Sequence, residues 1–132
     1  MKIQELRIGN KVSFKDTVVE IAGVSGIVYS FGAIDVTTSR GGKTDMHDLK
    51  TLSPIPLTEE MLSEFTMKWG TDPQEPNALM VFKNGEFEIL KFKDEDNFFC
   101  SNGRGLHSYI RHLHQLQNIF FDLTGNELDV KL

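Results

Sequence analysis

Short segments in which hydrophobic residues alternate with polar ones fill the first 53 residues of the chain. In the first segment Val12 and Phe14 fall on the same side, as in a half-buried strand. Turn residues such as Asp16 and Gly26 separate the segments. We expect strands at Lys11–Phe14, Val18–Val24, Ile27–Tyr29 and Ala33–Thr38, and a strand or a helical turn at Met46–Leu52. This pattern predicts a small β-barrel or a strongly bent sheet.

A pair of glycines and a pair of prolines interrupt the pattern of predicted strands. Gly41–Gly42 predicts a hairpin turn, because glycine reaches positive φ without steric cost. Pro54 and Pro56 interrupt the strands, because proline lacks the amide donor that a sheet needs. We therefore predict a β-rich module over residues 1–53 and an α+β module over residues 54–132, with one continuous domain as the alternative.

The second module begins with a helical pattern. Thr58 suits a helix N-cap. Met61, Leu62 and Phe65 have the spacing of one apolar helix face, which predicts a helix that ends near Met67.

A hairpin is the clearest local signal of the chain. Ala78–Phe82 and Glu86–Phe92 flank Lys83–Asn84–Gly85, and Asn-Gly is typical of a type I′ turn. Alternation in the second arm places Phe87 and Ile89 on one face, together with Lys91.

The remaining elements are a strand, a helix and a terminal strand. We expect a strand at Phe98–Cys100, a turn at Asn102–Gly105 and an alternating strand at Leu128–Leu132. Between them an amphipathic helix ends at Thr124–Gly125, and Leu106–Ile110 fits either its start or a strand. Its apolar stripe comprises Tyr109, Leu113, Leu116, Phe120 and Leu123. The predicted fold class is α+β, with a barrel-like or bent-sheet module followed by a helix, an antiparallel sheet and a long helix.

Composition agrees with a globular protein. Hydrophobic residues make up 39% of the 132 residues, and ten are Phe, which a disordered chain would lack. Cys100 is the single cysteine, so no internal disulfide forms, and its apolar neighbours predict a buried thiol. Lys2, Glu5 and Arg7 interrupt any apolar leader. We therefore expect no membrane span and a cytoplasmic location.

Charge is distributed unevenly along the chain. The net charge is −5, which disfavours an extended DNA-binding surface. Residues 1–53 carry +1 and residues 54–132 carry −6, so any nucleic-acid contact is expected in the first module. The candidate residues for such a contact are Arg7, Lys11, Lys15, Phe31, Arg40 and Lys43. Phe31 could instead fold back on the core as a cap.

A second candidate site lies in the glycine-containing turn. Arg104, Gly105 and Ser108 could hold an anion if a helix starts near Ser108 and offers free backbone amides. The alternative is a tight turn that needs its glycines for backbone conformation.

No catalytic residue, metal ligand or cofactor is assigned. His112 and His114 are two positions apart, so they point in different directions on a helix and do not share a metal. Gln117 lies at the margin of the apolar stripe. We expect its amide to satisfy backbone groups, because buried polar atoms nearly always find partners.

Three blocks of the chain resemble a known family. They read ELRIGNKV at Glu5–Val12, PIPLTEEML at Pro54–Leu62 and HQLQNIFFDLTGNEL at His114–Leu128. They are similar to small uncharacterised proteins of Bacteroides-type bacteria and their phages or prophages. The resemblance implies a cytoplasmic or mobile-element context and carries no site residues with it.

Three functions follow as hypotheses. The first is a non-enzymatic accessory protein of phage or mobile-element type that acts through a protein partner or self-association. Its motive is the abundance of apolar and aromatic residues without site chemistry. The second is a nucleic-acid-binding module that uses the β-rich part. The third is a small enzyme with an unrecognised site.

Overall fold

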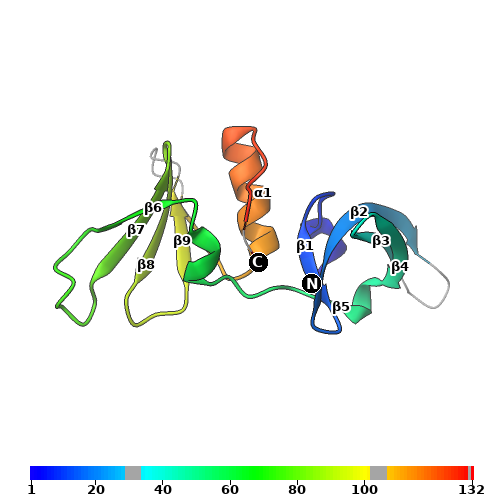
Figure 1. The fold of residues 1–132 in the computed structure, drawn as a ribbon, viewed down its shortest axis with the longest axis horizontal. Helices are drawn as coiled ribbons and strands as arrows, with labels where there is room; N and C mark the ends of the chain where they lie inside the picture. Colours follow the sequence, from blue (N-terminus) through cyan, green and yellow to red (C-terminus); the bar gives the residue numbers. More distant parts are fainter. Residues whose placement is uncertain (29–33, 102–106, 131) are drawn as a thin grey trace. The chain divides into compact units, whose positions relative to one another are not determined.

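The computed structural model describes residues 1–28, 34–101, 107–130 and 132, which form two compact units (Figure 1). The first unit comprises Met1–Pro56 and His112–Asn118, and the second comprises Leu57–Arg111 and Ile119–Leu132. Each unit holds one antiparallel sheet, so the class is α+β as predicted.

The first unit is built on a five-stranded sheet in the order β4-β3-β2-β1-β5. Alternating side chains of these strands form its core, with Val12, Val19, Ile21, Val36 and Leu52 buried together. Gly26 does not interrupt β2, which continues through two register shifts where two strands had been expected. The elements are η1 (Ile3–Glu5), β1 (Lys11–Phe14), β2 (Thr17–Val28), β3 (Ile34–Arg40), β4 (Lys43–Asp48), η2 (Leu49–Thr51) and β5 (Leu52–Ser53).

Two tight hairpins shape this sheet. Gly41 and Gly42 have φ of +57° and +82° between the paired residues Arg40 and Lys43, which confirms the predicted turn. Lys15 and Asp16 take φ of +47° and +63° between β1 and β2, although neither is glycine. Positive φ at two successive side-chain-bearing residues is costly, so the first turn stores backbone strain.

The sheet is strongly bent. Phe14 of β1 and His47 of β4 have ring centroids 4.0 Å apart, although β2 and β3 separate their strands in the sheet. The described strands form an open sheet, because β4 and β5 are its two edges and do not pair with each other. The prediction of a bent sheet is therefore confirmed, and that of a closed barrel is wrong.

The second unit holds a five-stranded sheet in the order β10-β9-β8-β7-β6. One face is buried, with Phe82, Phe87, Ile89, Phe98 and Ile110 among its core residues. Lys91 shares this face, and its amino group reaches Glu59 at 3.0 Å. Cys100 is buried, as expected. The strands are β6 (Thr66–Trp69), β7 (Leu79–Asn84), β8 (Phe87–Phe92), β9 (Phe98–Ser101) and β10 (His107–Ile110).

The predicted β7–β8 hairpin is confirmed, but its turn type is not. Asn84 pairs with Phe87, so Gly85 and Glu86 are the two central residues. Among the described residues near this turn, Gly85 alone has positive φ, at +64°. Glycine at the first central position fits a type II′ turn rather than type I′.

The predicted helix from Thr58 to Met67 is wrong. Its residues form a short 3₁₀ turn, η3 (Glu59–Leu62), and the Thr58 side chain makes no capping bond. Thr66 and Met67 belong to β6 and pair with β7. One turn of apolar spacing does not offset the cost of helix nucleation, whereas the neighbouring strand offers a full set of hydrogen bonds.

The last helix, α1 (Leu113–Thr124), is confirmed. It ends where predicted, at Gly125, whose amide donates to the Phe121 carbonyl at 2.8 Å. Tyr109 and Ser108 lie instead in β10, because their backbone pairs with β9. The strand expected at Leu128–Leu132 is absent from its described residues, and Leu128 is buried without strand pairing. No helix in the described residues is long and apolar enough to cross a membrane.

Two amides on α1 hold the N-terminal segment of the first unit. Gln117 is buried; its Oε1 accepts from the Lys11 amide at 2.9 Å, and its Nε2 donates to the Gly9 carbonyl at 3.3 Å. Asn118 Nδ2 donates to the Glu5 carbonyl at 2.7 Å, and Asn118 Oδ1 accepts from Asn10 Nδ2 at 2.8 Å. The expectation that Gln117 satisfies backbone groups is confirmed. We call these contacts the amide clasp.

His114 is buried beside the amide clasp. Its side chain is 1% exposed, and its Nε2 lies 3.7 Å from Glu5 Oε2, which is too long for a hydrogen bond. Burial, and secondly the nearby His112, lower the pKa of His114 below its ordinary value of 6.5, although Glu5 opposes this shift. The neutral ring is therefore the form that the fold favours.

Acid is expected to weaken the first unit through His114. A pKa that is lower in the folded than in the unfolded state means that the unfolded chain binds the proton first. Stability is then full above pH 6.5 and falls as pH decreases below it, by at most about 1.4 kcal/mol per pH unit. Chemical denaturation at pH 7.5 and 5.5 measures this loss. A His114→Gln variant keeps the other histidines, and an unchanged pH dependence in it would contradict the assignment.

Candidate functional site

A pocket of about 390 Å³ opens on the bent sheet of the first unit. Strands β1 to β4 supply its lining, and alternation along each strand turns the side chains to the same face. We call it the basic pocket, and it is lined by Phe14, Lys15, Thr17, Val19, Thr38, Arg40, Lys43, Asp45 and His47. Three of the six residues predicted for nucleic-acid contact, namely Lys15, Arg40 and Lys43, therefore lie together.

Arg40 and Lys43 are forced close by the glycine turn. They are direct cross-strand partners at the end of the β3–β4 hairpin. Like charges directly opposite each other destabilise a sheet. Within the part of the chain that the structure describes, no carboxylate pairs with either of them or with Lys15. An anion bound in the pocket would relieve this repulsion.

Lys15 is placed by the strained β1–β2 turn. Its φ of +47° is unusual for a residue with a long side chain. Its amino group lies 5.3 Å from the centroid of the Phe14 ring, within the range of a cation–π contact. Strained turns of this kind persist where the position of a side chain matters, and they are concentrated at binding sites.

Two aromatic rings line one side of the basic pocket. The rings of Phe14 and His47 are 4.0 Å apart and tilted by 38°. Both side chains are half-buried, so part of each ring faces the pocket and solvent. An aromatic surface next to cations offers a stacking partner for a flat ring and charge for its phosphate.

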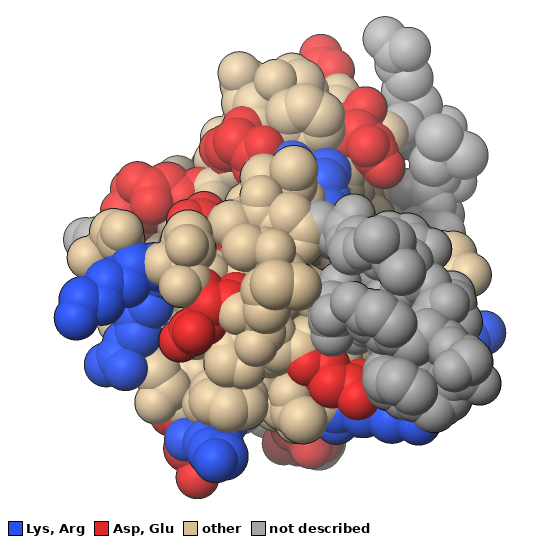
Figure 2. Space-filling view, turned by 90° about the vertical axis from the view of Figure 1, so that its right-hand side faces the viewer, with Lys and Arg blue, Asp and Glu red and all other residues tan. Residues whose placement is uncertain are grey.

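The charge of the site is local. Asp45 is the one acidic residue among the described lining residues, against Lys15, Arg40 and Lys43. Figure 2 shows that acidic and basic side chains are interspersed on the visible face, so no continuous basic surface extends across it. This agrees with the small net charge of residues 1–53 and limits the site to a short anionic ligand segment.

Two of the other predicted residues, Arg7 and Lys11, do not line the basic pocket. Arg7 Nε donates to Asn118 Oδ1 at 3.3 Å and belongs to the amide clasp. Lys11 Nζ lies 3.6 Å from Glu20 Oε1. Phe31 lies outside the described residues. In the structure Arg7 therefore has a structural role, and Lys11 forms a surface ion pair. The prediction that these two residues contact nucleic acid gains no support from their positions.

One of the observations on which the second predicted anion site depended is contradicted by the structure. Arg104 and Gly105 lie outside the described residues. Ser108 lies in β10, and α1 begins only at Leu113. The free amides of a helix start near Ser108, on which that hypothesis depended, are therefore not there.

Sequence reasoning missed Phe14, Thr38, Asp45 and His47 as members of the site. Period-two alternation carried a usable signal, because Lys43, Asp45 and His47 fall on one face of β4. The pattern of short strands predicted a bend, but it did not indicate which residues of β1 and β4 the bend brings together. In the described residues no three His, Cys, Asp or Glu side chains are arranged to hold a metal. No protein-family model, curated protein or solved structure matches the chain.

Proposed function

We propose that the protein binds single-stranded nucleic acid through the basic pocket of its first unit. The observation that carries the proposal is the forced pairing of Arg40 with Lys43, next to Lys15 and the Phe14–His47 rings. Phosphates would lie against the three cations, and a base would stack on the rings. Single-strand binding proteins combine the same two elements, a positive groove and aromatic stacking surfaces.

A single strand suits this geometry better than a duplex. Its bases are unpaired and can enter a pocket of about 390 Å³, whereas the bases of a duplex are stacked inside the helix. Duplex binding also relies on an extended basic surface, and acidic side chains interrupt the basic ones here (Figure 2). The proposed ligand is therefore a short stretch of single-stranded DNA or RNA.

The proposal changes the order of the hypotheses drawn from sequence. An accessory role through protein contacts was placed first because no site chemistry was evident in the sequence. The basic pocket supplies such chemistry in the part of the chain where a nucleic-acid contact was expected. An origin in a phage or mobile element, which the family resemblance implies, is compatible with single-strand binding and remains part of the proposal.

Binding is expected to depend on salt in a defined way. Each phosphate contact to a single strand contributes about −0.7 to the slope of log K against log salt concentration, so three contacts give about −2. The double variant Arg40→Ala with Lys43→Ala should reduce the magnitude of the slope, from about −2 to about −0.7. It should also weaken binding at low salt by about tenfold or more. Fluorescence anisotropy with labelled single-stranded and duplex DNA and RNA measures both quantities.

Two further variants make the test specific. Lys50→Ala removes an exposed cation of the same unit outside the pocket and should leave the slope unchanged. His47→Leu removes one ring and should weaken binding several-fold through lost stacking while the salt slope stays the same. If no oligonucleotide binds even at low salt, the proposal fails. Light scattering for self-association would then test the accessory role.

A further inference from the structure

The outer face of the second sheet contains a separate hollow of about 290 Å³. The pleat turns its wall residues away from the core: Leu79, Leu90, Phe92, Phe99 and Tyr109. Glu95 and Asn97 of the β8–β9 loop complete the lining. We call it the aromatic hollow. Its volume is at the lower end of ligand sites and suits a group of side-chain size.

Three rings surround the aromatic hollow on neighbouring strands. Tyr109 pairs with Phe99, which pairs with Leu90, so these side chains form one row across the sheet. The Phe99 and Tyr109 rings are 4.7 Å apart with their planes at 76°. Tyr109 is 70% exposed and Phe92 is 46% exposed. Two accessible rings beside a third, with Phe99 and Tyr109 at a steep angle, resemble the walls of an aromatic cage.

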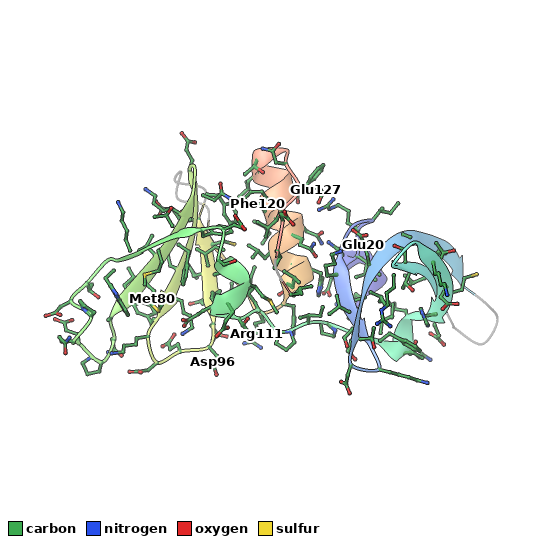
Figure 3. All side chains as sticks on the ribbon, in the orientation of Figure 1. Glu20, Met80, Asp96, Arg111, Phe120 and Glu127 are labelled. Carbon is green, nitrogen blue, oxygen red and sulfur yellow. The ribbon has the colours of Figure 1, made fainter. Side chains whose placement is uncertain are left out.

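The charge next to the rings is negative. Glu95 is the one charged residue among the described residues that line the aromatic hollow. It lies between Asp94 and Asp96 on an exposed loop, and Asp96 is labelled at that loop in Figure 3. Within the described residues no Lys or Arg pairs with the Glu95 carboxylate. A purely apolar ligand would make no favourable interaction with this carboxylate, and an anion would be repelled by it.

A cation with a hydrophobic surface satisfies both features. Ring faces are electronegative and attract a positive charge, and an alkylated cation loses little hydration when it leaves water. A bare ammonium or a metal ion instead demands several oxygen ligands, and the hollow is mainly apolar. We propose that the aromatic hollow binds an alkylammonium group, with the positive charge against the three rings and close to Glu95.

The test compares two ligands of the same shape that differ in charge. Choline carries a trimethylammonium group, and 3,3-dimethyl-1-butanol carries an uncharged tert-butyl group in its place. NMR titration of the full chain, with the ring signals of Phe99 and Tyr109 followed, should give choline a dissociation constant on the order of 1 mM. Choline should bind about fivefold or more tighter than the neutral isostere. Equal affinities, or shifts that avoid these rings, would overturn the proposal.

Variants assign the contribution of each group. Tyr109→Ala should abolish the preference for choline, and it should change stability little because Tyr109 is exposed. Glu95→Gln should weaken choline binding several-fold and leave the alcohol unaffected. Glu86→Gln removes an exposed acid elsewhere on the same sheet and is the matched control. If Glu86→Gln weakens choline binding as much as Glu95→Gln, the cation is held by net charge alone and the proposal is wrong.

Two sources of the same group can be separated. A peptide that carries trimethyllysine should bind, and the same peptide with unmodified lysine should bind less tightly, if the group is presented on a protein. Tighter binding of free choline than of either peptide would identify a small-molecule ligand. The proposal does not rest on the nucleic-acid function, so Arg40→Ala with Lys43→Ala should leave choline binding unchanged.

Discussion

Replacing Phe120 with alanine is expected to lower the free energy of unfolding of the second unit by about 3–5 kcal/mol. Phe120 is 6% exposed, and it contributes a side chain of α1 to the sheet's buried face. Its ring meets Phe87 at 5.2 Å and Phe65 at 6.3 Å, both in edge-on geometry. Truncation therefore removes buried surface, leaves a cavity and breaks two aromatic contacts at once.

Denaturation followed by Trp69 fluorescence measures this loss. Trp69 is the single tryptophan of the chain and lies on β6 of the second unit. Leu123→Ala, three residues along the same helix, is the matched control, because Leu123 is 43% exposed and its truncation should change stability by less than about 0.5 kcal/mol. Equal effects of the two substitutions would show that the three phenylalanines do not form the core of this unit.

The same pair of residues shows what periodicity can and cannot predict. Phe120 and Leu123 both fell on the predicted apolar stripe of the last helix, yet only Phe120 is buried. Leu113, Leu116 and Phe120 are covered, whereas the final turn of the helix is exposed. Periodicity identifies the face of a helix. How far along the helix that face is covered depends on elements distant in sequence.

Local signals predicted turns and failed where two local structures competed. Gly41–Gly42 and Asn84–Gly85 both lie at hairpins, because positive φ is a requirement of the turn itself. Thr58–Met67 had a cap residue and an apolar face but became a 3₁₀ turn and a strand. The helical pattern covered too few turns, and pairing with β7 determined the outcome.

The basic pocket was accessible to sequence reasoning only in part. Arg40 and Lys43 flank a glycine turn, so their proximity followed from the predicted hairpin. Lys15 lies on a different hairpin, and its position next to them depends on the bend of the whole sheet. The contact of Phe14 with His47 depends on the same bend, which no residue pattern along one strand encodes. Pairwise proximity within a hairpin is therefore predictable, whereas the assembly of a site across a curved sheet is not.

Two of the three sequence blocks quoted above, Glu5–Val12 and His114–Leu128, contact each other. Glu5–Val12 supplies the backbone groups of the amide clasp, and His114–Leu128 supplies Gln117 and Asn118. A glutamine and an asparagine in successive positions of a helix are thereby explained as structural. The proposed binding residues Arg40 and Lys43 lie outside all three blocks.

Replacing Gln117 with leucine is expected to lower the free energy of unfolding of the first unit by about 2–4 kcal/mol. Leucine keeps much of the volume but leaves the Lys11 amide and the Gly9 carbonyl without their partner. Gln117 is 3% exposed, so water does not readily replace the lost amide, and each unsatisfied buried group costs about 1–3 kcal/mol. Urea denaturation by circular dichroism gives the overall loss. Hydrogen exchange at the Lys11 amide should accelerate by about tenfold or more, which locates the loss at the clasp.

Gln4→Leu is the matched control for this substitution, because it makes the same chemical change at an exposed position of the same unit. It should leave both stability and the exchange rate at Lys11 nearly unchanged. A stable Gln117→Leu variant with normal exchange at Lys11 would show that the amide clasp is dispensable for the fold. Gln117 would then have to be explained by a function, and the residues around it would become candidates for a binding surface. The expected destabilisation instead makes the clasp the reason that the first half of α1, up to Asn118, folds with the N-terminal segment in the first unit.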